Sequence, residues 1–207
     1  MKPHTWPPAQ IFILLSLWLA LDYRWYALVW RRGYPVMALL LVVVGLWLAA
    51  RQQFSEVRLR WPRTEDWKIV LVTLAVLAVL LIPLGLALDF IHFAPAWPHL
   101  RRALLETLPI WLIVALPEEI IFRGMIQKTV QDRSGSTTLA VTVASVLFGL
   151  AHLHKGSPLP NWRYALLAAL AGAGYGLAFR RCGLMASSMT HALLDAIWRA
   201  FFRFTIV

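Results

Sequence analysis

The sequence predicts an all-α protein, a multi-pass transmembrane helical bundle of about seven helices (six to eight). Of the 207 residues, 60% are hydrophobic and 14% are charged, whereas soluble domains have about 45–50% and about 25%. Residues 69–88 contain no charge, and 20 helical residues cross about 30 Å of hydrocarbon. The basic residues lie between the apolar runs, as at helix ends on a membrane surface.

The formal net charge of +10 fits a lipid bilayer as partner better than a nucleic acid. Nucleic-acid binding would gather Lys and Arg on one soluble face. Here the basic groups fall in the gaps between apolar segments, namely at Arg31-Arg32, 51–68, Arg101-Arg102, 128–133 and Arg180-Arg181. We therefore expect contact with the bilayer and no nucleic-acid partner.

Apolar segments bounded by these gaps define the expected helices, in chain order 10–30, 35–50, 69–89, 103–131, 137–153, 163–179 and 184–204. The first carries Asp22 and Arg24 and the second is short, whereas the third is the uncharged run. The sixth contains Gly172, Gly174 and Gly176, which are typical of close helix packing in membranes. The remaining three carry the polar clusters described next.

Three polar clusters interrupt the later helices: Glu118-Glu119 with Arg123, Phe148 with His152, and His191 with Asp195. A charged side chain at the middle of a bilayer costs roughly 2.5–3.5 kcal/mol. At 1.5 Å per residue, the three clusters lie roughly 12–22 Å from one membrane surface. We therefore expect them to meet in the membrane interior and to form the functional site.

Residues four apart on a helix share a face, which predicts the contacts within each cluster. Glu119 pairs with Arg123, whereas Glu118 points about 100° away and is the candidate general base. Asp195 can accept a hydrogen bond from His191 and fix its tautomer. Taken singly, each cluster also suits a structural ion pair or an interhelical hydrogen bond.

Taken together and in this order, the clusters resemble the CPBP family of glutamic-type intramembrane proteases, also called the CAAX protease, bacteriocin-processing or Abi family. Its pattern is Glu-Glu-x-x-x-Arg, then Phe-x-x-x-His, then His-x-x-x-Asn or Asp. Glu118-Glu119 with Arg123, Phe148 with His152, and His191 with Asp195 supply it. The resemblance covers residues 103–204, which implies a CPBP-like core within the bundle.

The chain is thus expected to form one integral membrane unit with two parts. Residues 1–102 supply N-terminal transmembrane helices and a basic loop at 51–68. Residues 103–207 form the catalytic helical core. The small size and the N-terminal spans resemble bacterial members of the family, which places the protein in the bacterial cytoplasmic (inner) membrane.

The resemblance implies an intramembrane endopeptidase, a peptide hydrolase acting on a membrane-anchored peptide or protein without a cofactor. Glu118, assisted by His152, would deprotonate a water molecule, and His191 would hold that water or stabilise the oxyanion. Asp195 would orient His191, and Glu119 would pair with Arg123. Phe148 would support His152 by packing against its ring.

Position 195 departs from the prenyl-protein proteases of the family, which usually have Asn there. An ionised Asp only accepts hydrogen bonds, so Asp195, unlike Asn, has no hydrogen bond to donate to an oxyanion.

Two alternatives use the same polar residues. Glu118, His152 and His191 are a ligand set for hydrolytic zinc, and intramembrane carboxylates and histidines also build the pathways of small proton- or ion-coupled transporters.

Overall fold

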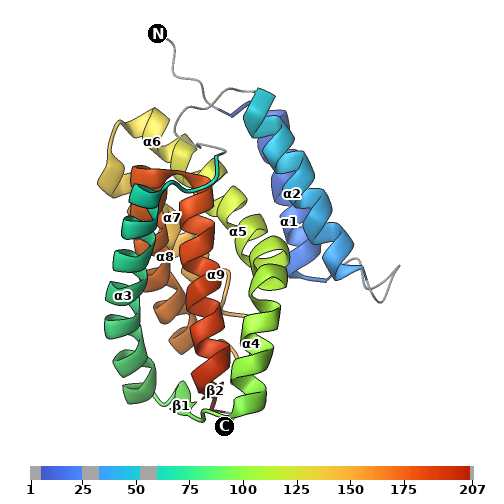
Figure 1. Ribbon diagram of the computed structural model, residues 1–207. Coiled ribbons are helices and arrows are strands. Elements are labelled where there is room, and N and C mark those ends of the chain that lie inside the picture. Colours follow the sequence, from blue (N-terminus) through green and yellow to red (C-terminus); the bar gives the residue numbers. More distant parts are fainter. Residues whose placement is uncertain (1–5, 25–32, 52–59, 206–207) are drawn as a thin grey trace.

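The computed structural model describes residues 6–24, 33–51 and 60–205. These residues form seven helical rods, and successive rods run in opposite directions (Figure 1). This confirms the predicted all-α bundle. The rods are α1 (Pro8–Asp22), α2 (Tyr34–Arg51), α3 (Thr64–Ala87), a composite rod over 97–134, α7 (Thr137–Leu150), α8 (Trp162–Cys182) and α9 (Leu184–Phe201).

The composite rod is not the regular helix expected over 103–131. It joins α4 (Trp97–Ile110), a π-helical segment (Trp111–Ala115), α5 (Leu116–Glu119), a second π-helical segment (Ile120–Gln127) and α6 (Lys128–Ser134). The wider i→i+5 turns of π-helices are rare and are frequent at functional sites. Here they flank the helical turn that carries the two adjacent glutamates.

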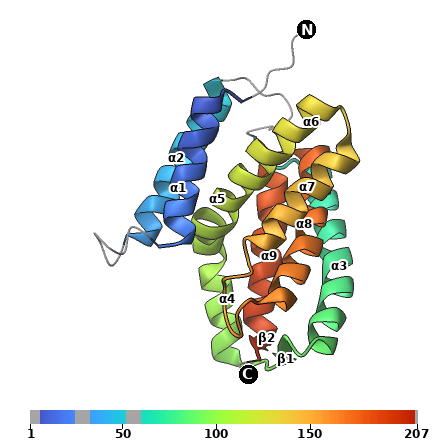
Figure 2. The same ribbon diagram turned by 180° about the vertical axis from the view of Figure 1, so that it is seen from behind.

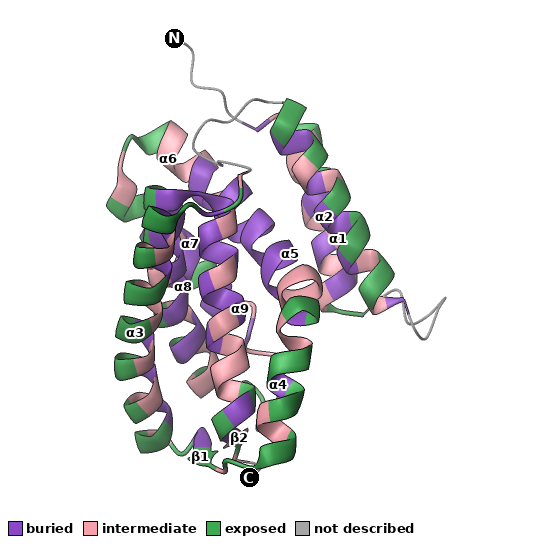
Figure 3. Ribbon diagram, in the orientation of Figure 1, coloured by how far each residue is buried: buried purple, intermediate pink, exposed green. Residues whose placement is uncertain are grey.

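The helix α9 lies inside the bundle, where it packs against α3, α8 and the composite rod (Figures 1 and 2). The helix α7 packs along α8, and α1 and α2 form a hairpin beside α5. The buried faces of α5 and α9 point inward, whereas the outer face of α3 is exposed (Figure 3). The second and third polar clusters therefore approach the first from α7 and α9.

Local side-chain contacts explain where α3 begins. The Asp66 carboxylate accepts from the Arg63 backbone N–H at 2.8 Å and from Arg60 at 2.6 Å, so the helix starts at Thr64, five residues before the apolar run. The first expected helix, 10–30, ends earlier at Asp22, and its residues 25–30 lie outside the described residues. A carboxylate in the first turn satisfies free backbone N–H groups.

A small antiparallel sheet closes the end of the bundle where the C-terminus lies, and the sequence did not predict it. Strand β1 (Ile91–Phe93) pairs with β2 (Phe202–Phe204), with Ile91 opposite Phe204. The expected helix 184–204 therefore stops at residue 201. The alternation Phe-Arg-Phe in β2 is a strand pattern, but it directly continues an apolar helix.

The outside of the bundle is apolar, which suits a lipid environment. On α3, exposed side chains include Leu71, Val72, Val76, Val79 and Leu80. Two helices, Tyr34–Arg51 and Thr64–Ala87, are long and apolar enough to cross a membrane by themselves. Although α3 precedes the expected boundary at residue 102, it packs against α8 and α9 of the core.

Candidate active site

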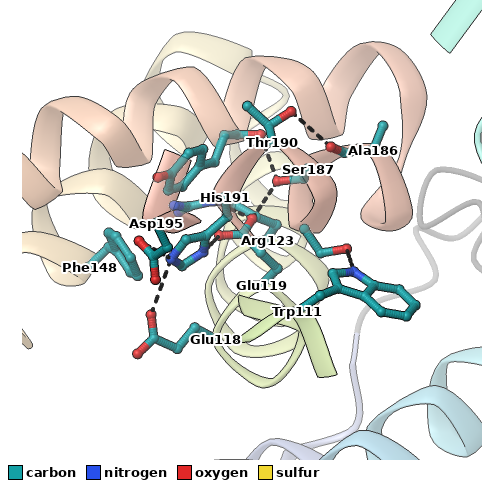
Figure 4. A network of polar contacts seen from close by, with 12 residues as sticks. Trp111, Glu118, Glu119, Arg123, Phe148, Ala186, Ser187, Thr190, His191 and Asp195 are labelled. Carbon is teal, nitrogen blue, oxygen red and sulfur yellow. Dashed lines mark hydrogen bonds and ion pairs between the residues drawn. The ribbon is translucent and has the colours of Figure 1, made fainter. Parts of the chain in front are cut away.

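Glu119 is fully buried and is the hub of a polar network between the composite rod and α9 (Figure 4). Its Oε2 lies 3.2 Å from Arg123 Nε and accepts a hydrogen bond from Ser187 Oγ. Its Oε1 accepts from His191 Nδ1 at 3.2 Å. The expected Glu119–Arg123 pair is therefore present, and this carboxylate also holds α9 in place.

Arg123 is enclosed by aromatic rings on its other side. Its guanidinium carbon lies 5.1 Å from the centroid of Phe148 and 5.9 Å from that of Tyr175. Contacts with ring faces offset part of the cost of burying a cation. Gly172 of α8 leaves space for the guanidinium, since a Cβ at this position would lie 3.2 Å from Arg123 Nη2.

Glu118 points away from this network and lines a cavity. Its Oε1 lies 3.2 Å from Lys155 Nζ, and its Oε2 lies 3.9 Å from His191 Nε2. The predicted divergence of the two neighbouring carboxylates is therefore present. Lys155, from the loop that follows α7, is a contact of Glu118 that the sequence did not suggest.

His152 lies in the turn directly after α7, and its tautomer follows from one hydrogen bond. Nδ1 lies 2.8 Å from the Phe148 carbonyl oxygen, which can only accept, so Nδ1 carries the proton. Nε2 then keeps its lone pair. The ring packs against Phe148, as expected, and against Tyr164, with centroid distances of 4.7 and 4.6 Å.

His191 is held from two sides. The Tyr175 ring stacks on it at 4.5 Å, with 14° between the planes, and Glu119 occupies its Nδ1. The hydrogen bond expected from Asp195 is not formed, because Asp195 Oδ1 lies 4.0 Å from Nε2, beyond hydrogen-bonding distance. Glu119, which lies on another rod, accepts from Nδ1 and so fixes the His191 tautomer instead. Asp195 lies beside the other ring nitrogen, Nε2.

The predicted site residues meet around one cavity of about 1280 Å³. Its lining includes Glu118, His152, His191 and Asp195, together with Lys155. Glu119 and Arg123 stand behind this wall, fully buried. The lining also contains exposed side chains near the C-terminal end of the bundle, Arg102 and Phe204 among them, so the cavity reaches the surface.

Four cavity or network residues were not predicted: Lys155, Ser187, Tyr175 and Tyr164. Lys155 is three residues after His152, which is the one signal that the sequence offered. The other three lie on α8 and α9 with no charge to mark them. Their roles depend on contacts between helices, which no spacing within one helix reveals.

The zinc alternative gains no geometric support in the part of the chain that the structure describes. No three His, Cys, Asp or Glu side chains there are grouped in a way that could hold a metal ion. The Lys155 ammonium already lies against Glu118, and a second cation at the same carboxylate would be repelled. We therefore derive no chemical step through a metal.

Comparison with known proteins gives a family for this part of the chain. The model of the family described as type II CAAX prenyl endopeptidase Rce1-like matches residues 100–197. This span contains all seven motif residues: Glu118, Glu119, Arg123, Phe148, His152, His191 and Asp195. No curated protein and no solved structure matches the chain. Residues 100–197 are thus similar to the Rce1-like family, which agrees with the CPBP resemblance.

Proposed function

We propose that the protein is a multi-pass intramembrane endopeptidase that hydrolyses a peptide bond of a membrane-anchored protein or peptide. The observation that carries the proposal is the convergence of Glu118, His152 and His191 from three rods on one cavity. An acidic group and two imidazoles around one cavity are the elements of general acid–base hydrolysis. The family match to endopeptidases supports the same reaction class.

In the proposed reaction, Glu118 removes a proton from a water molecule while the water oxygen attacks the substrate carbonyl carbon. His152 assists through Nε2, which keeps its lone pair because Nδ1 donates to Phe148. The proton passes to the nitrogen of the leaving amine as the C–N bond breaks. Both products then leave with complete valences, a carboxylic acid and an amine.

His191 lies where it can serve the water or the oxyanion through Nε2. As a neutral ring with Nδ1–H bound to Glu119, it accepts a hydrogen bond from the water. As an imidazolium, it donates to the oxygen that becomes negative in the tetrahedral intermediate. Asp195 lies 4.0 Å from Nε2 and contributes negative charge beside this ring.

The test uses purified protein in liposomes and a library of synthetic peptides, each with one apolar helix of about 20 residues. Half of the peptides carry a prenylated cysteine near the C-terminus, and half do not. We expect wild type to cut at one bond, detected by mass spectrometry, and Glu118→Gln to cut none. Both results should persist with a strong chelator.

Two outcomes would contradict this proposal. Folded wild type that cleaves no peptide but moves protons across the same liposomes would favour the transporter. Cleavage that requires stoichiometric zinc and disappears on chelation would favour a metal mechanism. The prenylated and unprenylated halves of the library distinguish the two classes of anchored substrate.

A further inference from the structure

Lys155 connects the proposed general base to a helix far away in the sequence. Its Nζ lies 3.2 Å from Glu118 Oε1 and 3.0 Å from Asp22 Oδ1. Asp22 is the last residue of α1, and α1 precedes the family-matched segment 100–197. One ammonium group therefore bridges a carboxylate of the composite rod and a carboxylate of the N-terminal hairpin.

The contact between α1 and this loop is clamped by a second pair of side chains. His154 Nε2 lies 3.3 Å from Asp22 Oδ2, so each Asp22 oxygen faces a different residue of the loop. The Tyr23 ring stacks on the His154 ring at 4.7 Å, with 8° between the planes. The end of α1 thus holds two consecutive loop residues, which fixes where Lys155 can reach.

Burial makes this bridge matter energetically. The Asp22 side chain is 5% exposed, the Glu118 side chain 11% and the Lys155 side chain 27%. Burial acts to lower the pKa of Lys155, but the carboxylates of Glu118 and Asp22 outweigh it and raise that pKa above its ordinary value. Removing one partner of such a group leaves an uncompensated charge.

The geometry also divides the two oxygens of Glu118 between two tasks. Oε1 is held by Lys155, and Oε2 faces His191 across 3.9 Å at the cavity. A carboxylate held by one oxygen keeps the other in a fixed position, which is what a general base needs to meet a water molecule. The Lys155 ammonium is therefore the group that holds Oε1 in place.

We propose that Asp22 is a positioning residue for the catalytic carboxylate: it holds Lys155 against Glu118 Oε1 and thereby aims Oε2 at the cavity. The inference rests on the proposed function, in which Glu118 is the general base. It makes the N-terminal hairpin part of the active site, although the family match does not include it. Lys155 is the group through which Asp22 acts.

The test is a double-mutant cycle on peptide cleavage with Asp22→Asn, Lys155→Met and the double variant. We expect Asp22→Asn to lower kcat by about tenfold, within the range for side chains of one ion-pair network. In the Lys155→Met background the same change should have no further effect. Lys155→Arg should keep more activity than Lys155→Met, because it keeps the charge.

The matched control is Asp132→Asn, which breaks the Lys128–Asp132 ion pair on α6, 2.7 Å long and also mostly buried. It should leave kcat unchanged. A thermal unfolding midpoint measured for every variant separates lost activity from lost fold. Should Asp22→Asn not fold, Asp22→Glu displaces the carboxylate by one methylene and should lower kcat in the same Lys155-dependent way.

A second readout does not need activity. Acetic anhydride at a fixed alkaline pH acetylates amines in their neutral form. Lys155, held as an ammonium by two carboxylates, should therefore react more slowly than Lys68, which is exposed. Asp22→Asn and Glu118→Gln should each accelerate acetylation of Lys155 several-fold and leave Lys68 unchanged, as resolved by peptide mass spectrometry.

The outcomes separate this inference from the proposed function. If wild type cleaves no peptide, or cleaves like Glu118→Gln, the proposed function fails whatever Lys155 does. If wild type cleaves, but Asp22→Asn leaves both kcat and the acetylation rate of Lys155 unchanged, the positioning role is overturned. An equal loss with and without Lys155 overturns it as well.

Discussion

Two neighbouring glutamates, Glu118 and Glu119, perform different tasks because they face different surroundings. Glu119 is 0% exposed and contacts Arg123, His191 and Ser187. Glu118 faces the cavity and contacts Lys155 from a loop. The first joins helices and fixes an imidazole, whereas the second turns one oxygen to the cavity, where we propose that it acts as the general base.

This difference predicts that the same substitution lowers stability by different amounts at the two positions. Glu119→Gln leaves the fully buried Arg123 cation without its counter-charge, which should lower the free energy of unfolding by about 3–5 kcal/mol. Glu118→Gln should abolish cleavage but lower the unfolding free energy less, because its partner Lys155 is partly exposed. Chemical denaturation in detergent micelles measures both. Equal stabilities for the two variants would contradict this division of labour.

The sequence predicted those contacts that depend on spacing along one helix. The Glu119–Arg123 pair and the packing of Phe148 on His152 follow from i,i+4 geometry and are present. The His191–Asp195 hydrogen bond was predicted by the same rule and is absent, because Asp195 Oδ1 lies 4.0 Å from Nε2, whereas Glu119 reaches Nδ1 from another rod. Contacts between elements depend on packing that spacing does not determine.

Close packing of α7 against α8 determines where His152 lies. A Cβ at Gly149, three residues before His152, would lie 2.5 Å from the Ala165 backbone oxygen and 2.7 Å from Ala169 Cβ. Since one of these atoms is backbone, a larger residue can be fitted only if the two helices move apart. Gly149 thus allows the approach that brings His152 to the cavity.

Gly149→Ala should therefore lower the free energy of unfolding by about 1–3 kcal/mol, as overpacking typically does, and should reduce cleavage by displacing His152. Gly124→Ala is the matched control. A Cβ there meets its nearest atoms at 3.9 Å, and Ala favours a helix over Gly by up to about 1 kcal/mol. Thermal unfolding and peptide cleavage are the measurements, and a Gly149→Ala protein as stable and active as Gly124→Ala would refute the packing argument.

Helix positions were largely predictable, but their ends and the local turn type were not. Apolar runs located all seven rods, because burial in a bundle or in lipid needs such runs. Asp66 extends α3 beyond its apolar run, and β2 continues an apolar helix as a strand. The two π-helical segments have no marker in the sequence that we know of.

Apolar side chains cover the outside of the bundle, and a network of charged side chains is buried within it. Exposed valines and leucines cover the outer face of α3, while Glu119, Arg123 and His191 are buried. Within the described residues, successive rods alternate in direction (Figure 1). In a bilayer, the two ends of α3 would therefore face opposite compartments.

Site-directed labelling tests this arrangement. The helix α3 has 24 residues, roughly 36 Å at 1.5 Å per residue, so single cysteines at its ends should react from opposite sides. Thr64→Cys and Ala87→Cys, both exposed positions, are made in a Cys182→Ala background. A membrane-impermeant maleimide added to sealed vesicles should label one and spare the other until detergent is added. Equal labelling of both would contradict a transbilayer α3.

The sharpest test asks whether Glu118 and His152 act as one hydrolytic unit. Glu118→Gln and His152→Asn, the latter chosen to keep the hydrogen bond to the Phe148 carbonyl, are compared with the double variant in peptide cleavage. We predict that each single variant loses about 10²–10⁴-fold in kcat/KM and that the double variant loses no more than the worse single one. A double variant whose loss equals the product of the two single losses, or a single variant that cleaves at the wild-type rate, would contradict the shared site.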